Sequence, residues 1–509
     1  MARSSVIPAP MEVRPAQGQD FRLGPDTAIL TEPGSARARH IGQYLATLLR
    51  PATGYQIPVL DADLAGATTT GQERGASAAT TPGTAKAISL RLGGGGLGPE
   101  GYRLNTTADG VSVRADAPAG LFAGVQTLRQ LLPADIESPT PVAREWTVPG
   151  GAIADRPRFP YRGAMLDLAR HFHSPDEIKA FVDQIAAYKI NHLHLHLTDD
   201  QGWRIEILSW PKLTAGDGGS GVDGAGGGYL TQAEYADLVA YAAERYVTVV
   251  PEIDMPGHTN AAQVAYPELN GGVAAAPRTD PEVGYSTLRI GDEITYAFVE
   301  DVVREVAALT PGPYLHVGGD EADATPDGDY RTFMRRIIPI VERHGKTVLG
   351  WHEITKADPP ASVVPQFWGT AGAHPEVAAA ATRGARVLMS PANRAYLDMK
   401  YTPDTPLGLD WAGYIEVRDA YEWDPATQIE GVGEAHVLGV EAPLWSETVR
   451  TLADVETMTY PRLPAVAEVG WSAPDRRDWE SFRRRLAAHA PRWTLRGTAF
   501  HRSPQIPWE

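Results

Sequence analysis

Eight short apolar segments, separated by stretches with helical periodicity, constrain the fold of this chain more than any other feature. Two of the separating stretches open with capping boxes, Ser174 with Glu177 and Thr231 with Glu234, which are typical helix starts. Strands that alternate with helices indicate parallel pairing, and eight such units fit a (β/α)8 TIM barrel. A doubly wound open sheet would alternate too, but no G-x-G-x-x-G motif opens the first helix. The expected strands are 161–168, 190–197, 246–253, 313–319, 346–351, 362–368, 386–391 and 437–445.

The residues before the barrel predict a smaller α+β domain. A strand is expected at 87–92, a hairpin over 101–116 with its turn at Asp109-Gly110, and a helix at 119–132. A small, polar, Gly-rich segment at 65–86 predicts a surface loop. No chemistry is visible in this part of the chain, so we expect a supporting domain.

The length of the chain favours two domains. A single hydrophobic core rarely grows beyond about 250–300 residues, and this chain has 509. The Pro- and Gly-containing stretch at 148–160 reads as a linker. We therefore expect an N-terminal α+β domain at 1–150 and the barrel at 151–509.

Composition excludes several classes of function. A net charge of -17 argues against a nucleic-acid backbone or an anionic membrane as partner. The absence of cysteine excludes thiolate metal sites, disulfides and a catalytic thiol. No apolar run is long enough for a membrane span, and the first residues lack the apolar core of a signal peptide. We expect a secreted protein whose leader has been removed, with a cytoplasmic protein as the alternative.

Carboxylates gather where the expected strands end, which is the active-site face of such a barrel. The sharpest group is Gly318-Gly319-Asp320-Glu321. Two consecutive side chains of a regular strand point to opposite faces, so both acids can reach one ligand only if the chain turns. The two glycines permit that turn. An isolated pair of this kind would be a solvated turn, but here other acids end neighbouring strands.

Tryptophans end three of the expected strands, at Trp351, Trp368 and Trp445. A single tryptophan is most often a packing residue. Three at one rim predict an apolar box that suits a methyl group and the C–H face of a sugar.

Histidines alternate in the second expected strand, at His192, His194 and His196, followed by Asp199. One interpretation is a metal-dependent barrel hydrolase that uses His194, His196 and Asp199 with His258 or Asp320. However, the histidines alternate with leucines in a strand that a parallel barrel buries on both faces. Buried histidines of this kind can be satisfied by hydrogen bonds, so we expect a mainly structural role and no metal.

Several ordered motifs carry a family resemblance that runs over the whole chain. The segments LDLARH, HLHLTDDQGWR, PEIDMPGH and HVGGDEA, together with the later tryptophans, resemble glycoside hydrolase family 20, the β-N-acetylhexosaminidases. The bacterial two-domain members are the most similar. The D-x-x-D-x-D-x-E strand of family 18 chitinases, which share the substrate-assisted mechanism, is missing.

The resemblance implies a role for each matching residue. Glu321 would be the general acid and base, and Asp320 would hold the acetamido N–H of the substrate. Tyr396 would donate a hydrogen bond to the acetamido oxygen. Asp199 and His258 would form a relay that sets the proton affinity of Glu321. The implied sugar-binding residues are Arg170, Trp351, Trp368, Asp398, Trp411, Trp445 and Glu447.

The implied activity is exo-acting hydrolysis of terminal β-linked GlcNAc or GalNAc, with chitooligosaccharides among the substrates. It would be retaining and substrate-assisted, through an oxazolinium intermediate. No cofactor, nucleic acid or membrane is implied, and the protein would be a monomer or homodimer. A carbohydrate-binding protein that has lost catalysis is an alternative, although the acid, the aspartate and the tyrosine are all present.

Overall fold

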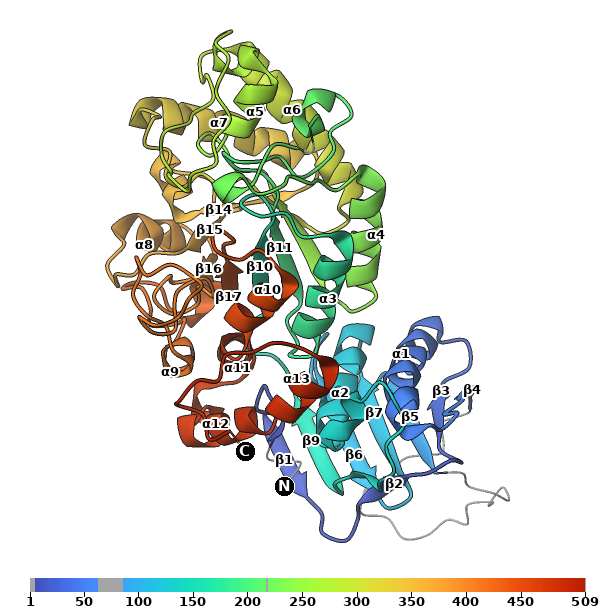
Figure 1. The fold of residues 1–509 in the computed structure, drawn as a ribbon. Coiled ribbons are helices and arrows are strands. Elements are labelled where there is room, and N and C mark those ends of the chain that lie inside the picture. The colour runs from blue at the N-terminus through green and yellow to red at the C-terminus, as the bar shows by residue number, and fades with distance from the viewer. Residues whose placement is uncertain (1–4, 63–85, 217, 509) are drawn as a thin grey trace. The chain divides into compact units, whose positions relative to one another are not determined.

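The computed structural model describes residues 5–62, 86–216 and 218–508. Contacts divide the chain into two compact units, coloured along the chain in Figure 1. The first unit comprises residues 1–158, 471–498 and 504–509, and the second comprises 159–470 and 499–503. Most of the loop expected at 65–86 lies outside the described residues.

The second unit is a closed barrel of parallel strands, in which each strand pairs with the next and the last pairs with the first. This confirms the predicted fold class. All eight expected segments contain a strand of the barrel. The strands are β10 (Tyr161–Asp167), β11 (His192–His196), β12 (Thr248–Glu252), β13 (Tyr314–His316), β14 (Thr347–Trp351), β15 (Val364–Phe367), β16 (Val387–Met389) and β17 (Val437–Leu444).

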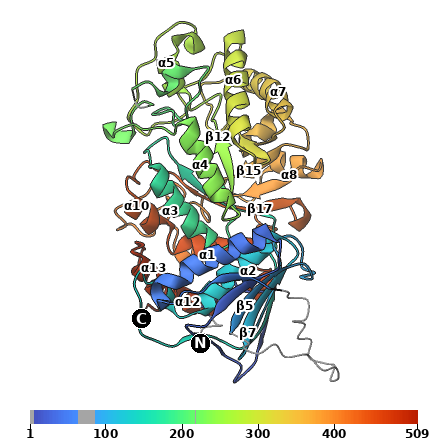
Figure 2. The ribbon, with the colours of Figure 1, turned by 90° about the vertical axis from the view of Figure 1, so that its right-hand side faces the viewer.

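Helices follow the barrel strands and lie outside them (Figures 1 and 2). The predicted capping boxes open α3 and α4: the hydroxyls of Ser174 and Thr231 accept from the backbone N–H three residues on, and the glutamates reach back. The α-helices are α3 (Pro175–Ala186), α4 (Gln232–Ala243), α5 (Asn260–Ala265), α6 (Glu293–Leu309), α7 (Asp327–Arg343), α8 (Pro375–Thr382), α9 (Val417–Tyr421), α10 (Leu452–Thr459) and α11 (Arg462–Trp471). Short 3-10 helices are η3 (Pro211–Thr214), η4 (Val222–Gly224), η5 (Pro267–Asn270), η6 (His352–Ala357) and η7 (Glu434–His436).

The first unit is built on a seven-stranded mixed sheet in the order β1-β9-β6-β7-β5-β3-β4. Helices α1 (Ala36–Thr53) and α2 (Pro118–Leu131) cover one face of it (Figure 2). The strands are β1 (Glu12–Pro15), β3 (Ala28–Thr31), β4 (Val59–Asp61), β5 (Ala87–Leu92), β6 (Tyr102–Thr107), β7 (Gly110–Ala115) and β9 (Gly151–Asp155), and β2 (Phe21–Leu23) pairs separately with β8 (Trp146–Val148). The remaining helices of the unit are η2 (Ala134–Glu137), η8 (Pro474–Arg476), α12 (Trp479–Ala487) and α13 (Ala490–Arg496).

Two details of the first unit differ from the sequence expectation. The β6–β7 hairpin exists, but Thr107 pairs with Gly110, so its two-residue turn is Ala108 and Asp109 rather than Asp109-Gly110. Gly110 is needed for another reason: a Cβ there would lie 2.7 Å from the carbonyl oxygen of Ala87 on β5.

The stretch read as a linker is also partly a strand. Residues 151–155 form β9, which pairs with β1 and β6, and the compact unit therefore extends to residue 158 rather than 150. Residues 471–498 join the same unit, although the expected division placed them with the barrel at 151–509. Within the described residues, no helix combines the length and the apolar character that a membrane crossing requires.

Candidate active site

A cavity of about 510 Å³ in the barrel unit gathers most of the predicted site residues. Nine of them line it: Arg170, Asp320, Glu321, Trp368, Tyr396, Asp398, Trp411, Trp445 and Glu447. Asp199 and His258 lie behind this wall. Pro281, Val283 and Leu409 complete the lining. The carboxyl ends of several barrel strands therefore meet around one cavity, as the fold requires.

A tight turn after β13 brings the two adjacent carboxylates to the cavity. Gly318 and Gly319 have φ of 64° and 96°, and Glu321 itself has φ of 42°. A Cβ on Gly318 would lie 1.7 Å from Oδ1 of Asp254, and that oxygen accepts from the Gly319 N–H at 3.0 Å. Left-handed backbone at a residue with a side chain costs about 1–3 kcal/mol and persists only where the surroundings hold it.

His258 links Asp199 to both cavity carboxylates. Its Nδ1 lies 3.1 Å from Asp199 Oδ1, and its Nε2 lies 3.5 Å from Glu321 Oε2 and 3.7 Å from Asp320 Oδ2. Burial opposes the charge of His258, but Asp199, Asp254 and Asp320 raise its pKa well above the usual value. The positively charged imidazolium therefore faces the pair of acids. His258 has φ of 54°, so its backbone is also held in an uncommon conformation.

Asp199 is fully buried and receives three cationic partners. Its Oδ2 lies 2.9 Å from Arg170 Nη2 and 2.8 Å from His196 Nε2. Burial alone would raise the pKa of Asp199, but Arg170 and His258 hold it well below the usual range. Asp199 is thus an anion that joins the expected sugar-binding arginine to the expected relay histidine.

Asp320 is held in an environment that resists its ionisation. Burial and then the nearby Asp254 raise its pKa well above the usual value, while His258 acts in the opposite direction. Asp254 is raised to a pKa of about 7, mainly by burial. Oδ1 of Asp320 has no hydrogen-bond partner among the described residues. A donor or a cation entering the cavity would satisfy that oxygen and favour its charge.

Arg170 is buried and lies among acids in the cavity lining. Asp167 accepts from the Arg170 backbone N–H at 3.2 Å and lies 3.4 Å from its guanidinium. Burial raises the pKa of Asp398 and of Glu447; Glu447 raises that of Asp398 further, whereas Arg170 lowers that of Glu447. Among the described residues, Arg170 Nε and Glu447 Oε2 have no hydrogen-bond partner. Buried polar atoms of this kind suit the hydroxyls of a ligand.

Aromatic side chains form the remaining wall. Trp445 lies under the Arg170 guanidinium, 5.0 Å from its Cζ. Trp368 donates from Nε1 to Glu353 at 3.0 Å and packs edge-on against Trp411. Trp411 also packs edge-on against Tyr396 and is 52% exposed, so it forms the outer edge of the cavity.

Trp351 does not line the cavity, unlike the other two tryptophans of the predicted box. Its indole is fully buried, and Nε1 donates to Glu252 at 2.9 Å in the barrel interior. Its ring lies 5.7 Å from that of Trp445. Trp351 therefore supports the wall from behind.

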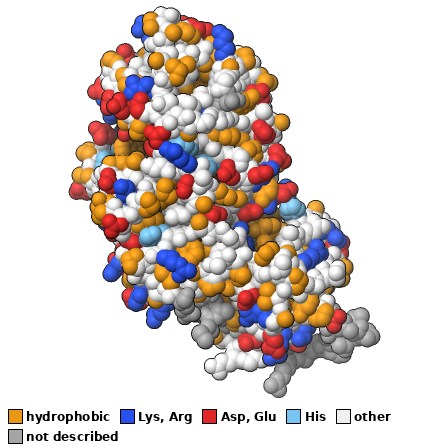
Figure 3. Space-filling view, viewed as in Figure 1, with side chains coloured by type: hydrophobic (Ala, Val, Ile, Leu, Met, Phe, Trp, Pro, Cys, Tyr) orange, Lys and Arg blue, Asp and Glu red, His pale blue; other side chains and the backbone are white. Residues whose placement is uncertain are grey.

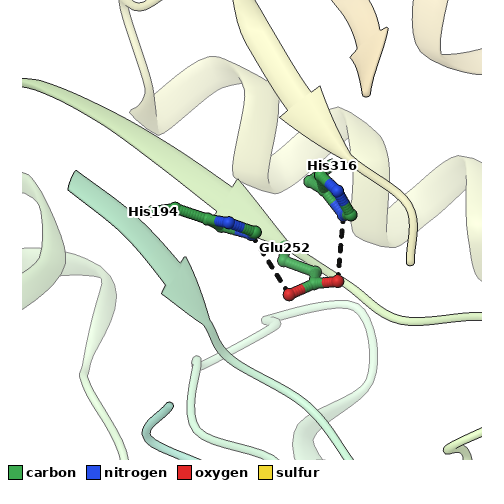
Figure 4. A group of neighbouring side chains, drawn as sticks. All are labelled: His194, Glu252 and His316. Carbon is green, nitrogen blue, oxygen red and sulfur yellow. Dashed lines mark ion pairs between the residues drawn. The ribbon is translucent and has the colours of Figure 1, made fainter. Parts of the chain in front are cut away.

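Two of the three alternating histidines of β11, His194 and His196, point at carboxylates. Figure 4 shows His194 and His316 on either side of Glu252. His194 also meets Glu441 at 2.8 Å, and His196 meets Glu252 and Asp199 at 2.5 and 2.8 Å. Both nitrogens of His196 and Nδ1 of His194 are thus hydrogen-bonded to carboxylates, and Nε2 of His194 lies 3.1 Å from Glu252 Oε2. These contacts agree with a structural role, and the same groups of His, Asp and Glu side chains also lie close enough together to hold a metal ion. His192 instead stacks on Tyr161, with ring centroids 3.8 Å apart.

Several residues that shape the site were not predicted. Asp254 and Glu353 follow expected strands and Glu252 lies at the end of one, so their position near strand ends was the available signal. What each carboxylate contacts depends on neighbouring strands and could not be derived from one segment. Pro281 and Val283 come from an irregular loop with no sequence signal.

Comparisons with known proteins agree with this geometry. The profile of the glycosyl hydrolase family 20 catalytic domain matches residues 159–330 and 327–474, and that of domain 2 of the same family matches 3–156. The β-N-acetylhexosaminidase of Cellulomonas fimi is 40% identical over 506 residues, which cover 99% of this chain and 97% of that protein.

Solved structures extend the likeness to the fold. The family 20 β-N-acetylhexosaminidase of Streptomyces coelicolor superimposes with a TM-score of 0.93 at 49% identity, covering 100% of this chain and 99% of that one. A mutant β-hexosaminidase of Streptomyces plicatus in complex with its product GlcNAc has a TM-score of 0.92 at 50% identity, covering 100% and 98%. The chain described here belongs to glycosyl hydrolase family 20.

Proposed function

We propose that this chain is an exo-acting β-N-acetylhexosaminidase. It removes terminal, non-reducing GlcNAc or GalNAc from β-linked glycosides, including chitooligosaccharides. The anomeric configuration is retained, and the 2-acetamido group of the substrate serves as the nucleophile.

The observation that carries the proposal is the placement of Asp320 and Glu321. They are consecutive in the chain, line one cavity and face the same nitrogen of His258. A retaining enzyme with its own nucleophile needs two carboxylates on opposite sides of the anomeric carbon. Two carboxylates on the same side instead suit one proton donor and one residue that holds the acetamido group.

In the first step, Glu321 donates a proton to the glycosidic oxygen while the acetamido oxygen attacks the anomeric carbon. The bond to the leaving group breaks and a cationic oxazolinium forms. Asp320 accepts the acetamido N–H and stabilises the positive charge, which offsets the burial that raises its pKa. Burial and Asp398 raise the pKa of Tyr396 well above its usual value, so its hydroxyl stays protonated and donates to the acetamido oxygen.

In the second step, ionised Glu321 takes a proton from water as the water attacks the anomeric carbon. The oxazolinium ring opens and the acetamido group is restored. Two displacements at one carbon give net retention.

A group of charged side chains in the cavity lining accounts for exo action. Arg170, Asp398 and Glu447 offer charged and polar atoms to the hydroxyls of the terminal sugar, and all three side chains line the cavity. Charge-assisted hydrogen bonds fix the orientation of that sugar. The exposed Trp411 lies at the open edge, where the next unit of the substrate would emerge.

The substitution Glu321→Gln tests the assignment of the acid. With a poor leaving group such as a second sugar, kcat should fall by about 10²–10⁴-fold, the usual contribution of a positioned acid. An activated phenyl leaving group needs less protonation and should lose much less. The measurement is kcat and KM on both substrates.

Asp323→Asn is the matched control, because Asp323 is an exposed carboxylate two residues away that does not line the cavity. It should leave both rates near wild type. Loss of less than threefold in Glu321→Gln with the poor leaving group would contradict the assignment.

A further inference from the structure

One carboxylate in the barrel interior, Glu252 of β12, collects four nitrogen atoms. Oε2 lies 2.5 Å from His196 Nδ1 and 3.1 Å from His194 Nε2. Oε1 lies 2.9 Å from both His316 Nδ1 and Trp351 Nε1. The contacts come from three other strands, β11, β13 and β14, and Glu252 is fully buried. Figure 4 shows the pairs that Glu252 makes with His194 and His316. A buried carboxylate with this many partners is held in one position.

His196 connects Glu252 to the active site. Its Nδ1 meets Glu252, and its Nε2 meets Asp199 at 2.8 Å. Both contacts are with acceptor oxygens, and an imidazole can donate from both nitrogens only when it is protonated. Neighbouring cations hold the pKa of Glu252 and of Asp199 well below the usual range, so both acids are carboxylates and His196 between them is an imidazolium. From Asp199 the contacts continue to Arg170 at 2.9 Å and to His258 at 3.1 Å.

Glu252 reaches the aromatic wall by a second route. It anchors the indole N–H of Trp351, whose ring packs against Trp445 in the cavity wall. His196 packs edge-on against the same Trp445, with ring centroids 4.8 Å apart. Glu252 therefore contacts side chains that support both the aromatic wall and the relay of Asp199 and His258.

We propose that Glu252 is a positioning residue for the hydrolysis: it keeps His196 charged and Trp351 in place, and so aligns Asp199 and the aromatic wall with the catalytic acid. This inference rests on the proposed function. It concerns a residue that touches no substrate and acts through two side chains, His196 and Trp351. A purely structural ion-pair network is the competing interpretation, since buried ion pairs also occur without a catalytic role.

The charges around this route determine the expected pH effect. Burial disfavours a charged His196, but Glu252, Asp199 and Asp167 raise its pKa well above the usual value. Loss of the Glu252 charge lets His196 become neutral, which removes support for the Asp199 anion. The groups that face Glu252 and His196 from the surrounding elements are His194, His316, Asp167, Asp199 and Asp254, with Glu441 beyond His194.

The test compares Glu252→Gln with Glu441→Gln in the full chain. Glu441 is equally buried and also pairs with His194, but it contacts Tyr161 and Gln366 instead of His196 and Trp351. In Glu252→Gln the acidic limb of kcat/KM should move to higher pH by about one unit. At pH values below the limb, this corresponds to a loss of about tenfold in kcat/KM. Both variants should lower Tm by a similar amount, but Glu441→Gln should leave the acidic limb in place.

Two further variants sharpen the comparison. Glu252→Asp keeps the negative charge and should return the limb toward the wild-type position. In the double variant of Glu252→Gln with Asp199→Asn, the limb should move no further than in Asp199→Asn alone, because both changes act on one route. A limb that does not move in Glu252→Gln, or moves equally in Glu441→Gln, would overturn the proposal.

A neutron diffraction map of the wild-type protein keeps the proposal testable if Glu252→Gln does not fold. Deuterons on both nitrogens of His196 are expected, and a neutral His196 would overturn the inference.

Wild-type activity separates the proposed function from the role of Glu252. If wild type does not hydrolyse β-N-acetylhexosaminides, the proposed function fails; if it does and the limb is unmoved, only the role of Glu252 fails.

Discussion

Asp199 shows how one buried residue can serve two parts of a site. It pairs with Arg170 at the proposed sugar-binding side of the cavity and with His258 beside the proposed acid, Glu321. None of these contacts is local in the sequence. The sequence predicted a pair of Asp199 and His258 only through the family resemblance. Contacts between residues on different strands cannot be derived from either segment alone.

Asp199→Asn should move the acidic limb of kcat/KM to higher pH. Asp199 raises the pKa of His258, and the charged His258 lowers the pKa of Asp320. Without Asp199, His258 loses its proton at lower pH and Asp320 becomes harder to ionise. Because Asp320 must be ionised to stabilise the oxazolinium, activity is lost earlier as pH falls. The measurement is kcat/KM from about pH 3 to 9.

Glu305→Gln is a suitable control for that profile. Glu305 is a buried carboxylate that binds the backbone N–H groups of Leu208 and Ser209 away from the cavity. Its replacement should lower stability and leave the limb in place. A profile of Asp199→Asn that coincides with wild type would exclude the relay.

The turn after β13 illustrates what an element contributes. The glycines of Gly318-Gly319 were expected to let both acids face one ligand, and both acids do line the cavity. What the sequence could not predict is why only glycine fits: the hydrogen atoms of Gly318 face Asp254, a residue of the preceding strand end.

Gly318→Ala should therefore damage the site more than its strain alone would. Its Cβ would meet Asp254 at 1.7 Å, so the turn must shift. We expect kcat/KM to fall by at least about tenfold, and the unfolding free energy to fall by about 1–3 kcal/mol. Kinetics with a chromogenic substrate and urea unfolding measure the two effects.

Gly345→Ala is the control that separates the effect of backbone strain from that of a steric clash. Gly345 has φ of 75° but open space around its Cβ position. It should lose stability and keep kcat/KM. Equal catalytic losses in both variants would mean that the contact with Asp254 is unimportant.

Elements with strong local signals were predicted well, and those decided by distant partners were not. The capping boxes at Ser174 and Thr231 and the apolar runs of the barrel strands are local patterns. The strand at 151–155 was predicted as part of a linker because the Pro and Gly residues of 148–160 resemble a loop, while its pairing partners lie more than 40 residues away in sequence. Trp351 points inward and donates to Glu252 on another strand, a contact that its own segment does not predict.

At the scale of the whole molecule, the charge is consistent with a neutral sugar as ligand. The chain carries a net charge of -17. On the face shown in Figure 3, the Lys and Arg side chains of the described residues are scattered among acidic and neutral ones.

Amphipathic helices do not indicate which core they join, so the assignment of residues 471–498 to the first unit could not be predicted.

The central claim is that the acetamido group of the substrate performs the nucleophilic step. The direct test is hydrolysis of p-nitrophenyl β-glycosides of GlcNAc, GalNAc and glucose by the same preparation of the wild-type enzyme. Because the leaving group is constant, the comparison isolates the 2-substituent. Substrate-assisted catalysis predicts turnover of at least one acetamido sugar and a kcat/KM for the glucoside lower by several orders of magnitude, since an intramolecular nucleophile supplies a large part of the acceleration. A glucoside hydrolysed at a comparable rate would contradict the account.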